Sequence, residues 1–445
     1  MQKNDQIIAT CENYTYDGSG VVKVDGFPLF VSGLIVKEKA LIQVIKCKKT
    51  YGYGKVIKLI EASEERVEPK CPLFHRCGGC HLQHMSQREQ RRFKQEQVQQ
   101  LMKRVAKNDL VVPEVIDMQD PYYYRNKAQI PVGLVDDQVV MGFYRTNSNV
   151  IIDHETCCIQ SKAINEIAQD CKHLIEKYKI ATNLRHVLIK DAFSTNEIMV
   201  VLISRKPDMD QLDAFVAELC KRHGNICSVI LNVNDRNDNV ILGDKETVLY
   251  GSDHIIDELS GLKFQISSKS FYQVNPLQTI KLYEQALAYA DLNGSEEVLD
   301  LYCGVGTISL FMAKHAFHVT GIEIVEKAID DAILNAQMNH MSNVDFICED
   351  ASSYAKSLVD ENKVVDVVMI DPPRKGCDEA SIQSIVAMKP NKVVYISCDP
   401  STLARDLYRF NELGYVSKAI QNFDLFPQSY HIESVVVISK KKSMA

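Results

Sequence analysis

The feature that most limits how this chain can fold is a rhythm of short apolar segments after about residue 261. The segments "EVLDLYCGVG", "HVTGIEI", "VDFICED", "DVVMIDPP" and "VVYISC" have the length of strands, and stretches long enough for a helix separate most of them. Strands that alternate with helices pair in parallel, with helices on both faces of the sheet. We therefore expect a doubly wound, Rossmann-like α/β domain over residues 263–445.

Acidic side chains end three of these segments, at Glu323, Asp350 and Asp371. Open α/β sheets bind ligands at the carboxyl ends of their strands. One such carboxylate is most simply a surface residue, but three in series favour a ligand site. We expect Glu323 to accept hydrogen bonds from ribose hydroxyls and Asp350 to meet an adenine edge.

The segment "LDLYCGVGTISLF" has the strand, glycine turn and helix order of a nucleotide site. Ser309 stands where a dinucleotide fingerprint has its third glycine. A glycine turn without that residue suits S-adenosylmethionine better than a dinucleotide, because there is no pyrophosphate to hold. The missing third glycine and the "DPPR" loop make an NAD dehydrogenase the least favoured of the possible functions.

A thiol, Cys398, follows the apolar run "VVYIS" and precedes Asp-Pro, where a buried strand should stop and a helix begin. The simplest interpretation is a small core residue. At the ligand-binding edge of a sheet, the same thiol is also a candidate nucleophile. The segment by itself favours the core residue.

The chain of 445 residues is too long for one core, so we expect two or three domains. It has no apolar run that would span a membrane and no signal-peptide start, which predicts a cytoplasmic protein with no membrane partner. Without a secretory signal, its 14 cysteines are better explained by metal ligands, catalytic thiols or packing than by disulfides.

The net charge of −7 hides an uneven distribution. Residues 36–107 contain 17 Lys and Arg against 7 Asp and Glu, a net charge of +10, so the rest carries −17. A basic quarter fused to an acidic body suggests a module that meets phosphate, although an uneven solvated surface would look the same.

Residues 1–60 contain short strand-like runs without a helical period, which predicts a small OB-like β-barrel. Its aromatic residues suit either an RNA-binding surface or the barrel core. The central part, residues 61–262, mixes strand-like and helical runs and is expected to be an α+β domain. A Cys/His-rich segment comes first in this part, and a basic helix with one apolar side follows it after residue 86. The aromatic residues of the N-terminal barrel that suit either role are Tyr14, Tyr16, Phe27, Tyr51 and Tyr53.

Three clustered cysteines form a C-x5-C-x2-C pattern at Cys71, Cys77 and Cys80, and Cys157 and Cys158 lie far along the chain. Thiols this close need a cation or cluster to neutralise thiolates, or else they are protonated core residues. The spacing suits a cubane cluster or zinc, and zinc stays possible because of three nearby histidines. The three are His75, His81 and His84.

The segments "SFYQVN", "DLYCGVGT", "DPPRKG", "YISCDPSTLARDL" and "FPQSYHIESV" occur in the order found in RNA uracil-5-methyltransferases, and the chain closely resembles that family. The match covers the whole C-terminal domain. The N-terminal barrel is similar to the TRAM domain of ribosomal-RNA members, and "CPLFHRCGGC" resembles their iron–sulfur motif. Because bacterial members that modify tRNA typically lack both, the resemblance implies a 23S ribosomal RNA substrate.

The resemblance implies that Cys398 adds to carbon 6 of uracil, which creates an enolate at carbon 5 that takes a methyl group from S-adenosylmethionine. Glu433 in "HIES" would then remove the carbon 5 proton. Phe271 is a candidate contact for the flipped base. The cofactor residues implied by the resemblance are Gln273, Tyr302, Glu323 and Asp371, with Thr307 and Asp350 as weaker candidates.

For the cysteines, the resemblance implies a [4Fe-4S] cluster on Cys71, Cys77 and Cys80. The family's fourth ligand stands three residues before a glutamine, which is Cys157 ahead of Gln160 here. The chain departs from the family by the second cysteine, Cys158, so the choice between the two stays open.

We also expect Arg91, Arg92 and Lys94 of the basic helix to contact RNA phosphates. No obligate protein partner is evident. Two alternatives to a 23S enzyme remain: the same reaction on tRNA, and a non-catalytic RNA-binding factor for ribosome assembly. A binder has no need of Cys398 and Glu433, which speaks against the second.

Overall fold

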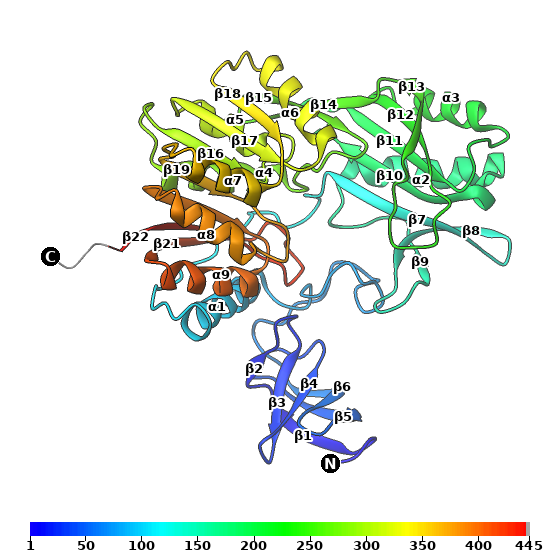
Figure 1. Ribbon diagram of the computed structural model, residues 1–445. Coiled ribbons are helices and arrows are strands. Elements are labelled where there is room, and N and C mark those ends of the chain that lie inside the picture. Colours follow the sequence, from blue (N-terminus) through cyan, green and yellow to red (C-terminus); the bar gives the residue numbers. More distant parts are fainter. Residues whose placement is uncertain (442–445) are drawn as a thin grey trace.

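The computed structural model describes residues 1–441, so 442–445, the end of the predicted catalytic domain, lie outside the described residues. Three sheets follow one another along the chain and form separate lobes (Figure 1). Within residues 1–441, no helix combines the length and the apolarity needed to cross a bilayer.

The N-terminal lobe is a six-stranded sheet with the order β1-β5-β6-β4-β3-β2. All its pairs are antiparallel except β4 with β6. Alternate side chains of β5 point inward to a small apolar core, as a half-buried strand requires. The strands are β1 (Gln6–Thr10), β2 (Asn13–Tyr14), β3 (Gly20–Val24), β4 (Phe27–Val31), β5 (Lys39–Cys47) and β6 (Gly52–Glu61).

The central lobe is a seven-stranded sheet with the order β13-β12-β11-β10-β7-β8-β9. Helices α2 and α3 pack on it, and β11, an interior strand, is buried along its whole length. The predicted mixture of strands and helices is present. Its elements are β7 (Lys127–Val135), β8 (Gln138–Tyr144), β9 (Ile151–Asp153), α2 (Lys162–Tyr178), the 3-10 turn Ala181–Asn183, β10 (Leu184–Asp191), β11 (Ile198–Ser204), α3 (Leu212–Arg222), β12 (Ile226–Val233) and β13 (Lys245–Gly251).

The C-terminal lobe contains the predicted parallel sheet, with the order β18-β17-β16-β19-β20-β22-β21. The first five strands are parallel, and β22 and β21 complete the sheet in antiparallel pairing. Apolar clusters on both faces confirm the doubly wound arrangement. Its strands are β16 (Glu297–Leu301), β17 (His318–Glu323), β18 (Val344–Cys348), β19 (Val367–Ile370), β20 (Lys392–Ser397), β21 (Tyr415–Phe423) and β22 (Glu433–Lys440).

Along the chain, one helix of this lobe precedes β16, and the others connect the strands from β16 to β21. A hairpin of two further strands precedes all of them and packs against α6 and α5. The hairpin strands are β14 (His254–Leu259) and β15 (Leu262–Ser267). The helices are α4 (Pro276–Ala290), α5 (Thr307–Ala313), α6 (Glu326–Met338), α7 (Ala351–Asp360), α8 (Glu379–Ala387) and α9 (Pro400–Glu412).

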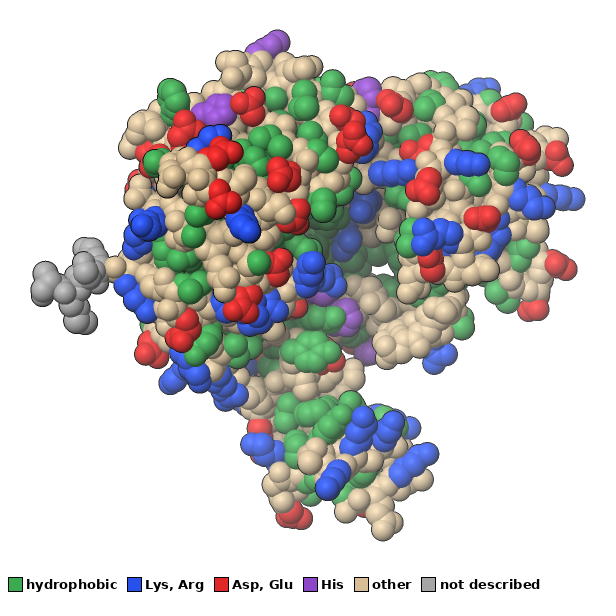
Figure 2. All heavy atoms as spheres, in the orientation of Figure 1, with side chains coloured by type: hydrophobic (Ala, Val, Ile, Leu, Met, Phe, Trp, Pro, Cys, Tyr) green, Lys and Arg blue, Asp and Glu red, His purple; other side chains and the backbone are tan. Residues whose placement is uncertain are grey.

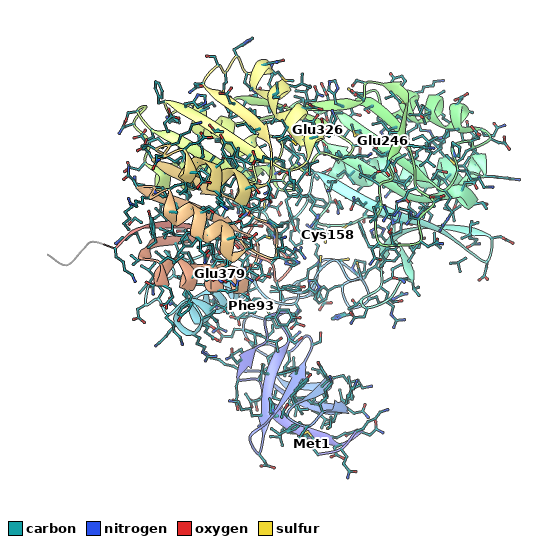
Figure 3. The ribbon with its side chains drawn as sticks, in the orientation of Figure 1. Met1, Phe93, Cys158, Glu246, Glu326 and Glu379 are labelled. Carbon is teal, nitrogen blue, oxygen red and sulfur yellow. The ribbon has the colours of Figure 1, made fainter. Side chains whose placement is uncertain are left out.

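The predicted basic helix is α1 (Gln87–Arg104), capped by the Ser86 side chain. Val98 and Met102 on its apolar side pack against the C-terminal lobe beside α9. The helix thus contacts the last lobe although it precedes the central lobe in the sequence. Phe93, labelled in Figure 3, packs where the N-terminal lobe meets the helix. This one helix therefore joins the first lobe to the last.

Candidate active site

Five residues predicted to be functional stand where parallel strands end. Tyr302 follows β16, Glu323 ends β17, Asp350 comes shortly after β18, Asp371 follows β19 and Cys398 follows β20. The carboxyl ends of parallel strands meet at one edge of a sheet, which is where such sheets bind ligands. The structure therefore brings these residues to a common edge.

The antiparallel strand β22 adds Glu433 to the same edge. Ser434 pairs with Ser397 of β20, so the next position along the two chains sets Glu433 opposite Cys398. Glu433 is only 4% exposed, whereas Cys398 is half-buried. A thiol open to a ligand thus stands beside a buried carboxyl group.

The charges at this edge disfavour a thiolate. Burial first, and then the charges of Glu433 and Asp371, raise the pKa of the Cys398 thiol to about 12. Burial and Asp371 likewise raise the pKa of Glu433 well above its ordinary value, and the Arg374 guanidinium opposes both shifts. Burial also raises the pKa of Asp371 to about 7. A positively charged ligand would therefore bind favourably at this edge, because it would stabilise the ionised forms of Cys398, Glu433 and Asp371.

The glycine turn after β16 is fixed by a carboxylate from the next strand. Tyr302 and Gly304 both have positive φ, at 69° and 56°. Glu323 accepts hydrogen bonds from the backbone N–H of Gly304 at 3.3 Å and from those of Ile324 and Val325 at 2.9 and 3.0 Å. Glu323 therefore shapes the turn as well as standing at the ligand edge.

The two weaker cofactor candidates are also engaged in local structure. Asp350 is exposed and caps α7 by accepting from the backbone N–H of Ser353 at 3.0 Å. Thr307 begins α5, and its hydroxyl lies 3.3 Å from the Tyr283 hydroxyl. Thr307 and the half-buried Gln273 line the same narrow gap, which is too small for a water molecule, so the structure brings these predicted cofactor residues close together.

A buried carboxyl group that the sequence did not point to lies beneath the glycine turn. Asp300 in β16 is fully buried, and its Oδ2 accepts from the Ser309 hydroxyl at 2.6 Å. Burial raises the pKa of Asp300 to about 7. Ser309, noted in the sequence only for not being glycine, therefore has a structural partner of its own.

The loop that carries Phe271 and Gln273 is held by the central lobe. The Lys190 ammonium, in β10, donates to the backbone carbonyls of Ser267 at 2.6 Å and Ser270 at 3.0 Å. Lys190 is 5% exposed, and burial lowers its pKa to about 7. Phe271 itself is 67% exposed. The sequence gave no sign of this contact, since β10 and the loop are distant along the chain.

The predicted cluster cysteines meet at a cavity of about 240 Å³ that all five thiols line. Cys158, labelled in Figure 3, lies between the three lobes. Burial above all raises the pKa of Cys80 to about 12 and that of Cys157 to about 11. Within residues 1–441, no three His, Cys, Asp or Glu side chains are placed to hold one metal ion; the thiols surround a space instead. The three histidines that kept zinc possible do not line this cavity.

The expected role of Lys94 in RNA binding is wrong. Lys94 is fully buried, and its ammonium lies 2.6 Å from the Asp424 carboxylate, so no phosphate reaches it. Arg91 and Arg92 are partly exposed and stay predicted RNA contacts, although carboxylates already neutralise both. An amphipathic pattern does not reveal which of its charged residues lie at an interface.

Comparisons with known proteins agree on one family. Residues 86–441 match the family model described as tRNA (Uracil-5-)-methyltransferase. An uncharacterized RNA methyltransferase of Halalkalibacterium halodurans is 46% identical over 450 residues, covering 99% of this chain and 98% of the relative. Another, from Listeria monocytogenes, is 43% identical over 446 residues, covering 98% of each.

Among solved structures, the chain is similar to the tRNA (uracil-54, C5)-methyltransferase of Pyrococcus abyssi in complex with S-adenosyl-L-homocysteine. The TM-score is 0.79 at 25% sequence identity, and the match covers 97% of this chain and 99% of that chain. The likeness thus includes all three lobes.

Proposed function

This chain belongs to the tRNA (uracil-5-)-methyltransferase family and is an RNA uracil-5-methyltransferase that uses S-adenosylmethionine; from that premise we propose that it methylates uridine in 23S ribosomal RNA. The observation that carries the catalytic assignment is Cys398 opposite Glu433 at the ligand edge of the sheet. The proposed roles of the two residues follow from the chemistry of uracil.

Carbon 5 of uracil is a weak nucleophile, so the Cys398 thiolate first adds to carbon 6 and leaves an enolate at carbon 5. That carbon then accepts the methyl group. The buried Glu433 carboxylate takes the remaining carbon 5 proton, and the thiolate leaves carbon 6. A carboxyl group whose pKa is raised by burial is a better base once ionised, which suits Glu433 to this step.

S-adenosylmethionine supplies the methyl group and a sulfonium positive charge, the kind of charge that this edge favours. We assign its binding to Gln273, Tyr302, Glu323 and Asp371, with Thr307 and Asp350 as further contacts. Their positions at the carboxyl ends of β16–β19 and around the glycine turn support this assignment. Phe271, exposed beside Gln273, is the proposed contact of the flipped uracil.

We assign the N-terminal sheet, residues 1–60, as a TRAM-like RNA-binding barrel. The rings of Phe30, Tyr51 and Tyr53 meet on its surface, and the Lys48 ammonium lies over the Tyr51 ring. Aromatic rings among cations bind single-stranded nucleic acid by stacking and charge. Figure 2 shows Lys and Arg side chains gathered on this lobe.

The other aromatic residues of this lobe divide between the two predicted roles. Phe27 packs against the core of the sheet, and Tyr14 packs on Phe93 of α1. Tyr16 is 71% exposed, with its ring centroid 6.2 Å from that of Tyr430, just before Glu433 in the chain. Tyr16 therefore extends the proposed RNA surface toward the catalytic residues.

The RNA substrate distinguishes two candidate functions. The cysteine motif and the N-terminal barrel favour 23S ribosomal RNA, which would place the enzyme in the cytoplasm. The Pyrococcus abyssi tRNA enzyme matches 97% of this chain, which favours tRNA.

Purified enzyme with S-adenosylmethionine should methylate unmodified 23S RNA, with 5-methyluridine detected by mass spectrometry of the digested RNA. Methylation of tRNA transcripts alone would overturn the 23S assignment.

We also propose that the cysteine cavity holds a [4Fe-4S] cluster on Cys71, Cys77, Cys80 and Cys157. Thiols spread around a space fit a cluster better than a single zinc ion, whose ligands converge on one point. Such a cluster would neutralise thiolates that burial otherwise disfavours and would tie the cysteine segment to the central lobe.

The adjacent cysteines provide a matched test of the fourth ligand. Cys157→Ser should lower the iron content and bleach the visible absorbance of anaerobically purified protein, whereas Cys158→Ser should keep both. The reason is that the Cys158 thiol already has a partner in the Gln83 amide nitrogen, which donates to it at 3.5 Å. The opposite pattern would exchange the two assignments, and zinc without iron in the wild-type protein would contradict the cluster.

Replacing Lys190 should weaken cofactor binding, although Lys190 is not itself a proposed contact of the cofactor. Lys190→Met removes both hydrogen bonds to the loop before Gln273, each worth roughly 1.5–3 kcal/mol for a charged donor. We expect a higher KM for S-adenosylmethionine in steady-state kinetics. Lys245→Met, the same change at an exposed position of β13, serves as the control. Equal KM values for the two variants would remove Lys190 from this role.

A further inference from the structure

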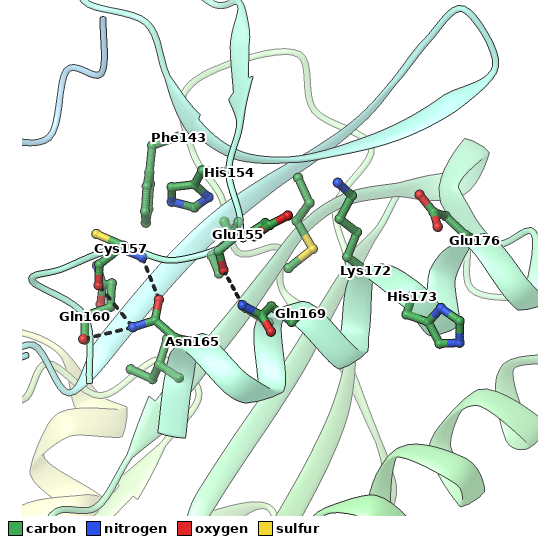
Figure 4. Close-up of a pocket in the computed structure, with 14 residues that line it drawn as sticks. Phe143, His154, Glu155, Cys157, Gln160, Asn165, Gln169, Lys172, His173 and Glu176 are labelled. Atoms are coloured by element: carbon green, nitrogen blue, oxygen red, sulfur yellow. Dashed lines mark hydrogen bonds between the residues drawn. The ribbon is translucent and has the colours of Figure 1, made fainter. Parts of the chain in front are cut away.

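A second cavity, of about 450 Å³, lies in the central lobe beside the cysteine cavity (Figure 4). One wall is the face of α2 that carries Ile164 and Ala168, and the other comes from β7, β8 and the chain after β9. Phe143, His154, Cys157 and Gln160 line both cavities. The proposed catalytic residues do not line it, so the mechanism above does not account for it.

Buried polar groups at this cavity lack partners within the described chain. Gln160 is 95% buried, and its Oε1 accepts no hydrogen bond. Both ring nitrogens of His154 are buried without a partner as well. Asn165, by contrast, is fully used, because its amide bonds the backbone of Cys157 and of residues 160 and 161. Buried groups of this kind are normally satisfied, and the space is far larger than the roughly 30 Å³ of one water.

The remaining lining limits the kind of ligand. Glu155 and Glu176 bring negative charge, while the Lys172 ammonium is held by Asp153 at 2.7 Å. A phosphate or carboxylate group is therefore disfavoured inside. The rings of Phe143 and His154 stand at 90° to each other with centroids 5.0 Å apart, which offers one face and one edge to a flat ring.

We infer that this cavity receives an unpaired nucleobase of the RNA substrate, distinct from the target uridine. The glutamine amide presents a donor and an acceptor side by side, which is how amide side chains read base edges, and aromatic stacking on single-stranded bases is the usual mode of RNA recognition. The inference rests on the proposed RNA substrate, but it concerns binding and not methyl transfer. The base would fix which RNA loop is presented to Cys398.

The test pairs two variants with base deletions in the RNA. The RNA is whichever of a 23S fragment and a tRNA transcript binds the wild-type protein more tightly. Gln160→Leu and His154→Phe should each raise the Kd for this RNA by about tenfold, roughly 1.4 kcal/mol. The salt dependence of Kd should not change, because no phosphate contact is lost. Removing single bases from the RNA should reveal one position, other than the target, whose loss weakens wild-type binding but not binding by Gln160→Leu.

Controls separate this result from damage to the protein. Gln383→Leu makes the same change at an exposed position of α8 and should bind like the wild type. Each variant must keep the wild-type metal content and visible spectrum. If Gln160→Leu changes either of these, His154→Phe takes its place in the base-deletion test. Well-formed variants whose Kd changes by less than about twofold, or base-deletion penalties that persist in full, would overturn the inference. Because Kd is measured without turnover, failure of the proposed methyl transfer would leave this outcome readable.

Discussion

Cys398→Ala should abolish uridine methylation, by roughly 10⁴-fold or more, while leaving the binding of RNA and S-adenosylmethionine intact. Without the thiol no bond forms to carbon 6, so the carbon 5 enolate never arises. Methyl transfer from radiolabelled S-adenosylmethionine measures the loss, and filter binding measures the two affinities. Cys220→Ala, on α3 of the central lobe, is the control and should keep full activity.

Glu433→Gln should fail at a later step. Glutamine keeps the size of the side chain but is not basic, so methyl transfer proceeds and elimination stalls. A covalent protein–RNA species carrying the transferred methyl group should accumulate and survive denaturing gel electrophoresis. The double variant Cys398→Ala/Glu433→Gln should form none, because the adduct depends on the thiol.

Two outcomes would contradict this scheme. Methylation by Cys398→Ala at a rate comparable to that of the wild type would exclude the thiol as the nucleophile. A Glu433→Gln protein that turns over normally and traps nothing would remove only Glu433 from its role. If the buried Glu433 instead served stability, its variant would unfold more easily and form no adduct, which circular dichroism would reveal.

Lys94→Met should destabilise the protein by roughly 3–5 kcal/mol, because it leaves the Asp424 carboxylate buried without its cation. Asp424 begins the segment that leads to Glu433, and Gln90, one turn before Lys94 on α1, also bonds to this segment through Gln428. We therefore expect activity to fall along with stability.

Urea unfolding followed by far-ultraviolet circular dichroism measures this effect, since the chain has no tryptophan. The double variant Lys94→Met/Asp424→Leu should recover much of the loss, because no charge is then left unpaired. Lys103→Met, on the exposed side of the same helix, should be neutral. Equal unfolding midpoints for the Lys94 and Lys103 variants would show that the buried pair contributes nothing.

The local sequence pattern was sufficient to predict those features that depend on a single strand and the residues that follow it. The apolar runs after residue 261 predicted the parallel sheet, and the residues ending them predicted the edge where Glu323, Asp371 and Cys398 now lie. A strand must bury its side chains, and a parallel sheet exposes its carboxyl ends at one edge, so the position of these residues follows from their place in the sequence.

Only the tertiary structure decided which charges are buried and which distant segments meet. Lys94 belongs to a basic helix in the sequence, yet its partner Asp424 is 330 residues away. Lys190 and the loop before Gln273 likewise become neighbours only when the lobes pack. Local sequence records the apolar period of an element, whereas the desolvation and pairing of a charge depend on what packs against it.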